Sequence, residues 1–213
     1  MNIPAELVKK LREMSGAPMM ECKKALEACG GDLDAAFTEL RKRGQAAAAK
    51  KAGRVAAEGV IGSYVHQGAQ IAVIAELNCE SDFVARTEEF QQLAHDVAMH
   101  ICATDPKYIR KEDVDASVIE REKAILREQA ASSGKPAAVI EKMVEGRLGK
   151  FFEETCLYEQ HFIKDAPAGQ TVGELIASKI AKFGENIGVR RFARFKVGEG
   201  VQKEAPEAGS RVE

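Results

Sequence analysis

Apolar residues recur at helical spacing in three runs within residues 1–44, and each run is followed by glycine. In the first run Leu7, Leu11 and Met14 stand at i, i+4 and i+7 before a Ser-Gly pair. The second run begins after a proline, and the third follows an aspartate placed as a helix N-cap. The apolar faces of these two runs are Met19, Cys22, Leu26 and Cys29, and then Leu33, Ala36, Phe37 and Leu40. We therefore predict a three-helix domain over residues 1–44 whose third helix ends at Gly44. So short a domain buries little area, and we expect it to act as a docking surface.

The next segment lacks an amphipathic pattern. From Gln45 to Arg54 no apolar side chain is larger than alanine. Such a segment could form a solvated helix or a flexible arm, with Lys50 and Lys51 exposed. We interpret residues 45–57 as a linker.

Beyond the linker the apolar period becomes that of extended chain. Residues 60–66 and 70–78 are rich in Val, Ile and Leu and are separated by a Gln-Gly turn, which predicts a β-hairpin. A helix should begin at Thr87, and its apolar face is Phe90, Leu93, Ala94, Val97, Ala98 and Ile101. Later segments predict a strand over residues 156–163, a helix capped by Thr171 and Glu174, and a last strand near residues 189–197.

Two further helices are predicted between about residues 117 and 154. Ser117 and Glu120 suit a capping box for the first helix, and Pro136 opens the second. The connection over residues 132–135 is so short that the helices should lie antiparallel as a projecting hairpin.

These elements predict an α+β fold, in which an antiparallel sheet packed with helices and the helical hairpin form a core over residues 58–200. Residues 201–213 lack periodicity, and we expect a disordered tail there.

Composition and charge narrow the function. Apolar residues make up 45% of the chain and charged residues 30%, which is typical of a globular protein. The 31 basic and 33 acidic residues nearly cancel, so no net field favours nucleic acid as a partner. We find no secretory segment and no apolar run of about 20 residues, and we expect a cytoplasmic protein without a membrane partner.

Candidate catalytic and metal-binding patterns are weak. The five cysteines include no CxxC pair, so we expect reduced and mostly buried thiols. His95 and His100 stand five apart, which does not match the HExxH zinc motif. The chain has neither a GxxxxGK[ST] nor a GxGxxG loop. We therefore expect no enzyme, no metal and no cofactor.

One connector carries a carboxylate beside a large aromatic residue. It reads Asn78-Cys79-Glu80-Ser81-Asp82-Phe83-Val84-Ala85 and lies between the predicted second strand and its following helix. Binding residues concentrate in such connectors. By spacing alone, Asp82 could simply cap a turn and Phe83 could pack into the core.

This connector resembles the signature loop of the elongation factor Ts family, with Ser81 in place of the usual Thr. Further blocks are similar to family patterns in the same order and cover residues 1 to about 200. These blocks are Leu11-Arg12, Ser15-Gly16-Ala17, Met19 to Leu26, Lys50 to Arg54, Ala56 to Gly59, Glu185-Asn186-Ile187 and Arg190-Arg191-Phe192. Pro18 stands where the family commonly has Gly, and Glu21 where it commonly has Asp.

The resemblance implies a ubiquitin-associated-type N-terminal domain and a guanine nucleotide exchange factor. Its implied partner is the GTPase elongation factor Tu, in its GDP-bound and nucleotide-free forms. The implied contact loop is Ser81, Asp82, Phe83 and Val84, with Phe83 prying helices apart while Asp82 perturbs the groups that support magnesium. Implied secondary contacts are Met19, Met20 and His66.

Several alternatives remain open at this point. One of Met19 and Met20 could belong to the core, and His66 could be structural. A ribosome- or RNA-binding protein is the strongest rival, through basic residues of the linker and the last strand, which are Lys50, Lys51, Arg54, Arg190, Arg191, Arg194 and Lys196. Only one copy of the core fits in this chain, whereas longer family members carry two, so we predict a homodimer.

Overall fold

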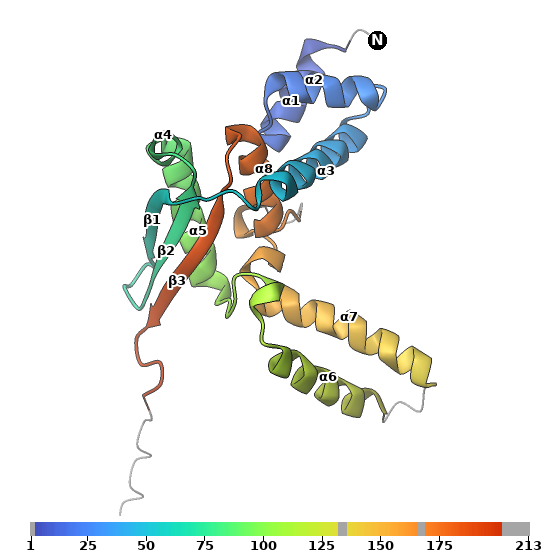
Figure 1. Cartoon of the computed structure of the whole chain (residues 1–213), viewed down its shortest axis with the longest axis vertical. Coiled ribbons are helices and arrows are strands. Elements are labelled where there is room, and N and C mark those ends of the chain that lie inside the picture. The colour runs from blue at the N-terminus through green and yellow to red at the C-terminus, as the bar shows by residue number, and fades with distance from the viewer. Residues whose placement is uncertain (1–2, 132–135, 166–168, 202–213) are drawn as a thin grey trace, which may run out of the picture.

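The computed structural model describes residues 3–131, 136–165 and 169–201 (Figure 1). Its three strands form one antiparallel sheet in the order β1-β2-β3, and helices cover that sheet on one face. The predicted α+β class is therefore confirmed. The predicted turn over residues 132–135 lies outside the described residues, and so does the predicted tail over residues 201–213 apart from Val201.

The first three helices form a small body with a core of its own. They are α1 (Ala5–Ser15), α2 (Met19–Ala28) and α3 (Leu33–Lys51). The Asp32 carboxylate accepts a hydrogen bond of 2.9 Å from the backbone N–H of Ala35, which confirms the predicted cap. The residues buried between the helices are Val8, Leu11, Cys22, Ala25, Leu26 and Ala36.

Helix α3 does not end at Gly44, as we predicted, but continues to Lys51. Gly44 is buried where α3 crosses α8 (Val172–Phe183), and a Cβ there would lie 3.7 Å from the carbonyl oxygen of Ala177. This glycine lies between two packed helices and does not act as a helix stop. Residues 45–51 of the predicted linker are therefore helical. They are also partly covered, because Ala48 packs against the main core.

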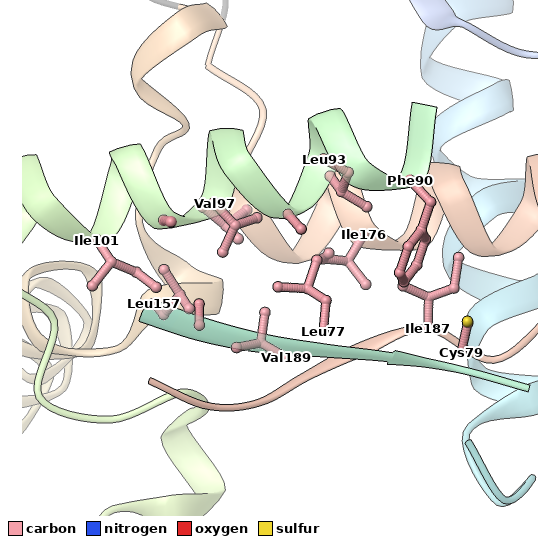
Figure 2. Packing of buried hydrophobic residues seen from close by; sticks show 14 of the residues in the cluster. Leu77, Cys79, Phe90, Leu93, Val97, Ile101, Leu157, Ile176, Ile187 and Val189 are labelled. Atoms are coloured by element: carbon pink, nitrogen blue, oxygen red, sulfur yellow. The ribbon is translucent and has the colours of Figure 1, made fainter. Parts of the chain in front are cut away.

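The sheet begins with the predicted hairpin. Strand β1 (Glu58–Val65) pairs with β2 (Ile71–Cys79) from Glu58↔Cys79 to Val65↔Ala72, and β3 (Gly188–Lys196) pairs along the other edge of β2. The last strand is thus confirmed. The main core lies between the sheet and helices α5 and α8, and Figure 2 shows Leu77, Phe90, Val97 and Ile176 meeting there.

Helix α5 (Glu88–Thr104) confirms the helix predicted after Thr87, whose hydroxyl accepts from the N–H of Phe90 at 3.3 Å. All six residues of its predicted apolar face are buried. Helix α8 begins with the predicted capping box of Thr171 and Glu174 and ends at Gly184 in the left-handed region. Strong periodicity and caps therefore located both helices that cover the sheet.

Helices α6 (Ala116–Ala131) and α7 (Ala137–Thr155) lie side by side and extend away from the sheet (Figure 1). Arg127 of α6 binds Glu141 of α7 through Nε at 2.9 Å. The predicted capping box of Ser117 is wrong, because α6 begins at Ala116 and so includes Ser117 in its first turn, and Glu120 instead binds Lys123 at 2.8 Å.

The strand predicted over residues 156–163 is absent from the structure, which has two short 3-10 turns there, Leu157–Glu159 and Ile163–Asp165. Leu157 and Phe162 are buried, so the apolar pattern was real. Their backbone groups bond to separate segments: the N–H of Leu157 to Tyr108 and that of Phe162 to Gln170. No neighbouring strand is available at this place in the described chain, and the segment bridges α7 and α8 without joining the sheet.

Candidate functional site

The connector between β2 and α5 folds into a single helical turn, α4 (Asp82–Ala85). Ser81, and not Asp82, is its N-cap, since the Ser81 hydroxyl accepts from the N–H of Val84 at 3.3 Å. Val84 and Ala85 are buried and fasten the turn to the core. Of the four predicted loop residues, Val84 therefore anchors the turn, and Asp82 and Phe83 lie on its outside.

Phe83 is 79% exposed. Leaving a phenyl ring in water forgoes about 2 kcal/mol of favourable burial. The alternative in which Phe83 packs into the core is thus wrong. An aromatic ring on an anchored turn is suited to insertion into a partner's pocket.

Asp82 pairs with Arg86 at 3.0 Å across the turn, and their side chains are 61% and 81% exposed. Such an exposed pair is worth little because water screens it. A partner can therefore draw the Asp82 carboxylate away at small cost.

The turn is held from behind by groups that the sequence did not identify as part of the site. The Cys79 thiol donates to the carbonyl of Ser81 at 3.1 Å. Burial, and next the nearby Glu185 carboxylate, raise the pKa of Cys79, so the thiol stays protonated and able to donate. Glu185 itself accepts from the backbone N–H of Ser81 at 3.0 Å. Glu185 stands in one of the blocks that resemble the family, but its contact with the loop spans about a hundred residues of sequence and has no local signal.

The predicted secondary contacts do not gather around Phe83. Met19 and Met20 are 50% and 61% exposed at the start of α2, so neither belongs to the core. His66 is exposed in the turn between β1 and β2, where Tyr64 lies 3.4 Å from its Nδ1. Because β2 has 9 residues at about 3.3 Å each, His66 and Phe83 stand roughly 30 Å apart, at opposite ends of the strand.

Comparison with known proteins identifies the family. A family model described as elongation factor TS matches residues 34–168. An elongation factor Ts of Koribacter versatilis (strain Ellin345) is 60% identical over 199 residues, which are 93% of this chain and 90% of that protein. An elongation factor Ts of Syntrophomonas wolfei subsp. wolfei is 57% identical over 210 residues, 99% of this chain and 97% of that protein. The chain belongs to the elongation factor Ts family.

Membership in the elongation factor Ts family confirms the resemblance and places the chain among translation elongation factors. A third family member, from Carboxydothermus hydrogenoformans, is 55% identical over 99% of this chain and 96% of its own length. This chain and these family members are therefore of similar length.

Three of the four basic residues of β3, on which an RNA-binding role would partly depend, lie against acids. Arg191 and Arg190 bind the two oxygens of Glu76 at 2.6 and 3.0 Å. The hydrogen bonds from Arg191 and then Arg190 lower the pKa of Glu76 and keep it charged. Arg194 is only 11% exposed and lies 3.5 Å from Asp105. Acidic neighbours therefore offset part of the positive charge of this strand, and Arg190 and Arg191 share the single carboxylate of Glu76.

Metal-binding and membrane-spanning features are absent from the described part of the chain. Its residues contain no cluster of three or more His, Cys, Asp or Glu side chains that could hold a metal ion. All five cysteines lie within it and are free, and four of them are buried. Within the same residues, none of the helices has the length and apolar character needed to cross a bilayer.

Proposed function

We propose that this chain is a guanine nucleotide exchange factor that binds elongation factor Tu and releases its GDP. The observation that carries the proposal is the exposed phenyl ring of Phe83 on a turn anchored by Val84 and capped by Ser81. The chain acts by binding alone and carries out no covalent step. By linkage, a factor that prefers nucleotide-free GTPase weakens GDP binding by the same ratio.

The mechanism follows from how GTPases hold nucleotide. Backbone donors and a lysine hold the phosphates, and magnesium bridges phosphate oxygens to protein ligands. Phe83 inserts between helices beside that site, where burial of its ring contributes about 2 kcal/mol. Asp82 leaves Arg86 and perturbs the groups that support the metal. Both effects loosen GDP.

The N-terminal body supplies a second contact in this proposal. Met19 and Met20 are exposed side by side at the start of α2, and methionine forms adaptable apolar contacts. We infer that they bind the GTPase domain, and that α1 to α3 form the ubiquitin-associated-type domain that the family resemblance implies.

We further propose that the chain is a homodimer that uses the outer face of its sheet. By strand register, four exposed apolar side chains share this face, on the side opposite α5 and α8. They are Ile61, Val65, Ile74 and Phe195. Such a patch on a sheet face is typical of a protein interface. A two-fold axis through it would let the two protomers supply the Asp82 and His66 surfaces in turn.

The experiment is the release of fluorescent GDP from elongation factor Tu, with and without this chain. We expect a large acceleration, and we expect Phe83→Ala to reduce it by a factor of about 30, the equivalent of ~2 kcal/mol at a central contact. Asp82→Ala should also reduce it. Val201→Ala is the matched control, since Val201 is 71% exposed beyond the last strand.

Two results would count against the proposal. One is undiminished GDP release with both Phe83→Ala and Asp82→Ala. The other is tight, steeply salt-dependent RNA binding without any GTPase, which would favour the ribosome- or RNA-binding alternative. The pairing of Arg190 and Arg191 with Glu76 argues against that alternative.

A further inference from the structure

Two acidic residues on neighbouring loops each bind the backbone of the other's loop. Glu185 Oε2 accepts from the N–H groups of Glu80 and Ser81, at 3.1 and 3.0 Å. Its Oε1 accepts from the Ser81 hydroxyl at 2.5 Å. In return, Glu80 Oε1 accepts from the N–H of Asn186 at 2.6 Å. We name this set of four hydrogen bonds the Glu80–Glu185 network.

A third segment of the chain contacts the Glu80–Glu185 network. Arg54, which follows α3, lies 3.5 Å from Glu80 Oε1 through its Nη1. The carbonyl of Arg54 accepts from the side-chain amide of Asn186 at 2.7 Å. The chain after α3, the loop before α4 and the loop between α8 and β3 are therefore tied at one point.

Both carboxylates accept hydrogen bonds from backbone N–H groups of the opposite loop. Hydrogen bonds to a charged acceptor are about twice as strong as those between neutral groups. The bonds of Glu185 fall on the residues directly before α4, which has only 4 residues and is too short to hold its own shape.

We propose that Glu185, with Glu80 as its counterpart, is the positioning residue that holds the turn bearing Phe83 in its binding conformation. The proposal rests on the guanine nucleotide exchange function proposed above. Phe83 is exposed and has little packing of its own, so the backbone of the turn determines where its ring points. A loose turn would have to be ordered when the ring inserts, at a cost in conformational entropy.

The test measures GDP release from elongation factor Tu over a range of concentrations of full-length variants. For Glu185→Ala we expect the limiting rate to fall about tenfold while the half-saturating concentration changes less than about twofold, because other contacts still dock the chain. Glu112→Ala is the matched control. Glu112 is an exposed glutamate that is remote from this loop in sequence and takes no part in the Glu80–Glu185 network. Amide hydrogen exchange should accelerate over residues 80–86 and stay slow in the central part of β2.

A double variant separates positioning from a general structural role. If Glu185 acts through Phe83, Glu185→Ala in a Phe83→Ala background should cause no further loss. Losses that multiply would overturn the inference, and so would a Glu185→Ala protein as active as the wild type. Should Glu185→Ala fail to fold, Glu185→Gln replaces it. The Gln amide keeps an oxygen that accepts from the two N–H groups, so we expect the limiting rate of GDP release to fall only about threefold. This loss must likewise be absent in the Phe83→Ala background.

The two proposals fail in different ways. If the wild-type chain does not accelerate GDP release, or if Phe83→Ala is fully active, the exchange mechanism itself is wrong. If Phe83→Ala is impaired and Glu185→Ala is not, only the positioning role of Glu185 is wrong.

Discussion

At the scale of single residues, Gly62 is a position with no room for any other side chain. A Cβ at this point of β1 would lie 2.3 Å from the carbonyl oxygen of Ala94 and 2.5 Å from its carbonyl carbon. Both are backbone atoms of α5 and cannot rotate away. The closeness of strand and helix therefore depends on glycine.

We predict that Gly62→Ala lowers the free energy of unfolding by about 2 to 3 kcal/mol, because the strand must move off α5. Gly146→Ala is the control: Gly146 is exposed in α7, a methyl group there would meet no atom within 4 Å, and the variant should gain about 1 kcal/mol from better helix propensity. Urea unfolding of both variants checks the pair. Equal stability of the two would contradict this account of the interface.

His100 is a buried polar residue between α5 and the segment that follows α7. Its Nε2 lies 3.0 Å from the side-chain oxygen of Gln160, and its Nδ1 accepts from the N–H of Ile163 at 3.4 Å. These partners require a neutral ring with the proton on Nε2. Burial lowers the pKa of His100 from its usual 6.5, against a smaller opposing effect of the Gln160 hydrogen bond.

The sign of the pH effect follows from this lowered pKa. Below pH 6.5 the unfolded chain binds a proton at this histidine that the folded chain does not, so stability falls as the pH drops from 6.5 towards the lowered folded pKa. We predict that His100→Gln, which cannot titrate, loses less stability than the wild type between pH 7 and pH 5, roughly the range over which a histidine titrates. Denaturant unfolding at several pH values measures the slopes. Identical slopes would show that His100 is not responsible.

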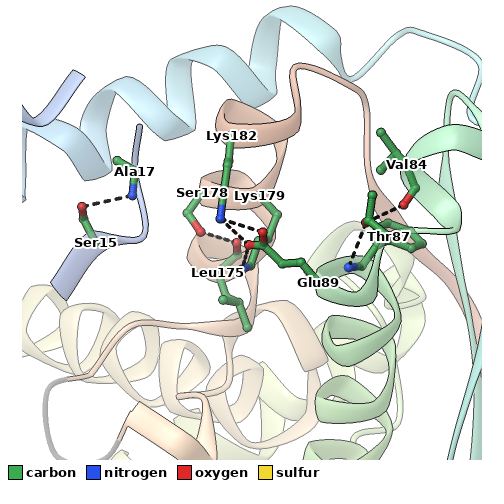
Figure 3. Close-up of polar contacts among 10 residues, drawn as sticks. Ser15, Ala17, Val84, Thr87, Glu89, Leu175, Ser178, Lys179 and Lys182 are labelled. Carbon is green, nitrogen blue, oxygen red and sulfur yellow. Dashed lines mark hydrogen bonds and ion pairs between the residues drawn. The ribbon is translucent and has the colours of Figure 1, made fainter. Parts of the chain in front are cut away.

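At the scale of elements, the two helices that cover the sheet are joined by one acidic residue. Figure 3 shows the carboxylate of Glu89, in the first turn of α5, in contact with the ammonium groups of both Lys179 and Lys182 of α8. Both ion pairs measure 2.6 Å. Partial burial pushes the pKa of Glu89 upward, but the hydrogen bonds from the two lysines outweigh it and lower that pKa. The contact also lies directly after the Thr87 cap, so it supports the start of α5.

We predict that Glu89→Gln lowers the free energy of unfolding by about 1 kcal/mol, a modest value because the lysines are partly exposed and water screens them. A double-mutant cycle with Lys182→Ala should give a coupling energy of about 0.5 kcal/mol, typical of one partly exposed pair. Absence of any coupling would mean that the ion pair in the structure adds nothing to stability.

The elements that could be predicted are those with complete local signals. Thr87 and Thr171 mark helix starts by capping, and the alternation in residues 60–78 marks the hairpin. Gly44 misled the prediction because a glycine buried between helices has the same sequence appearance as one that ends a helix. The segment at residues 156–163 misled it because the absence of a partner strand depends on contacts with distant residues.

The site was predictable in part for the same reason. Asp82 and Phe83 stand in a recognisable local pattern, and the structure places both on the outside of the turn. Glu185 bonds to residues more than a hundred positions away, and no local pattern announces such a pairing. Local patterns therefore pointed to the exposed residues of the turn and missed the support behind them.

At the scale of the whole molecule, the sheet has one covered and one open face. Helices α5 and α8 bury the inner face, while Ile74, on the central strand, is 50% exposed on the outer face. A covered outer face would remove this apolar area from water, which is the physical basis of the proposed homodimer.

We predict that sedimentation gives a dimer for the wild type at micromolar concentration and a monomer for Ile74→Glu, because the substitution would bury a charge at the centre of the interface. Ile125→Glu is the control, since Ile125 is 43% exposed on α6, outside the sheet. Circular dichroism should show unchanged secondary structure for both. A wild type that sediments as a monomer would exclude the dimer.

The length of strand β2 determines how far apart the turns at its two ends lie. It separates the His66 turn from the Phe83 turn by an unbroken run of 9 residues, so the span between the two is fixed by covalent geometry. Inserting one residue would lengthen that span by about 3.3 Å and turn the side chains beyond it to the opposite face. Two inserted residues would restore the facing but double the added length. Any molecule that binds at both ends of β2 must therefore match the length of the strand.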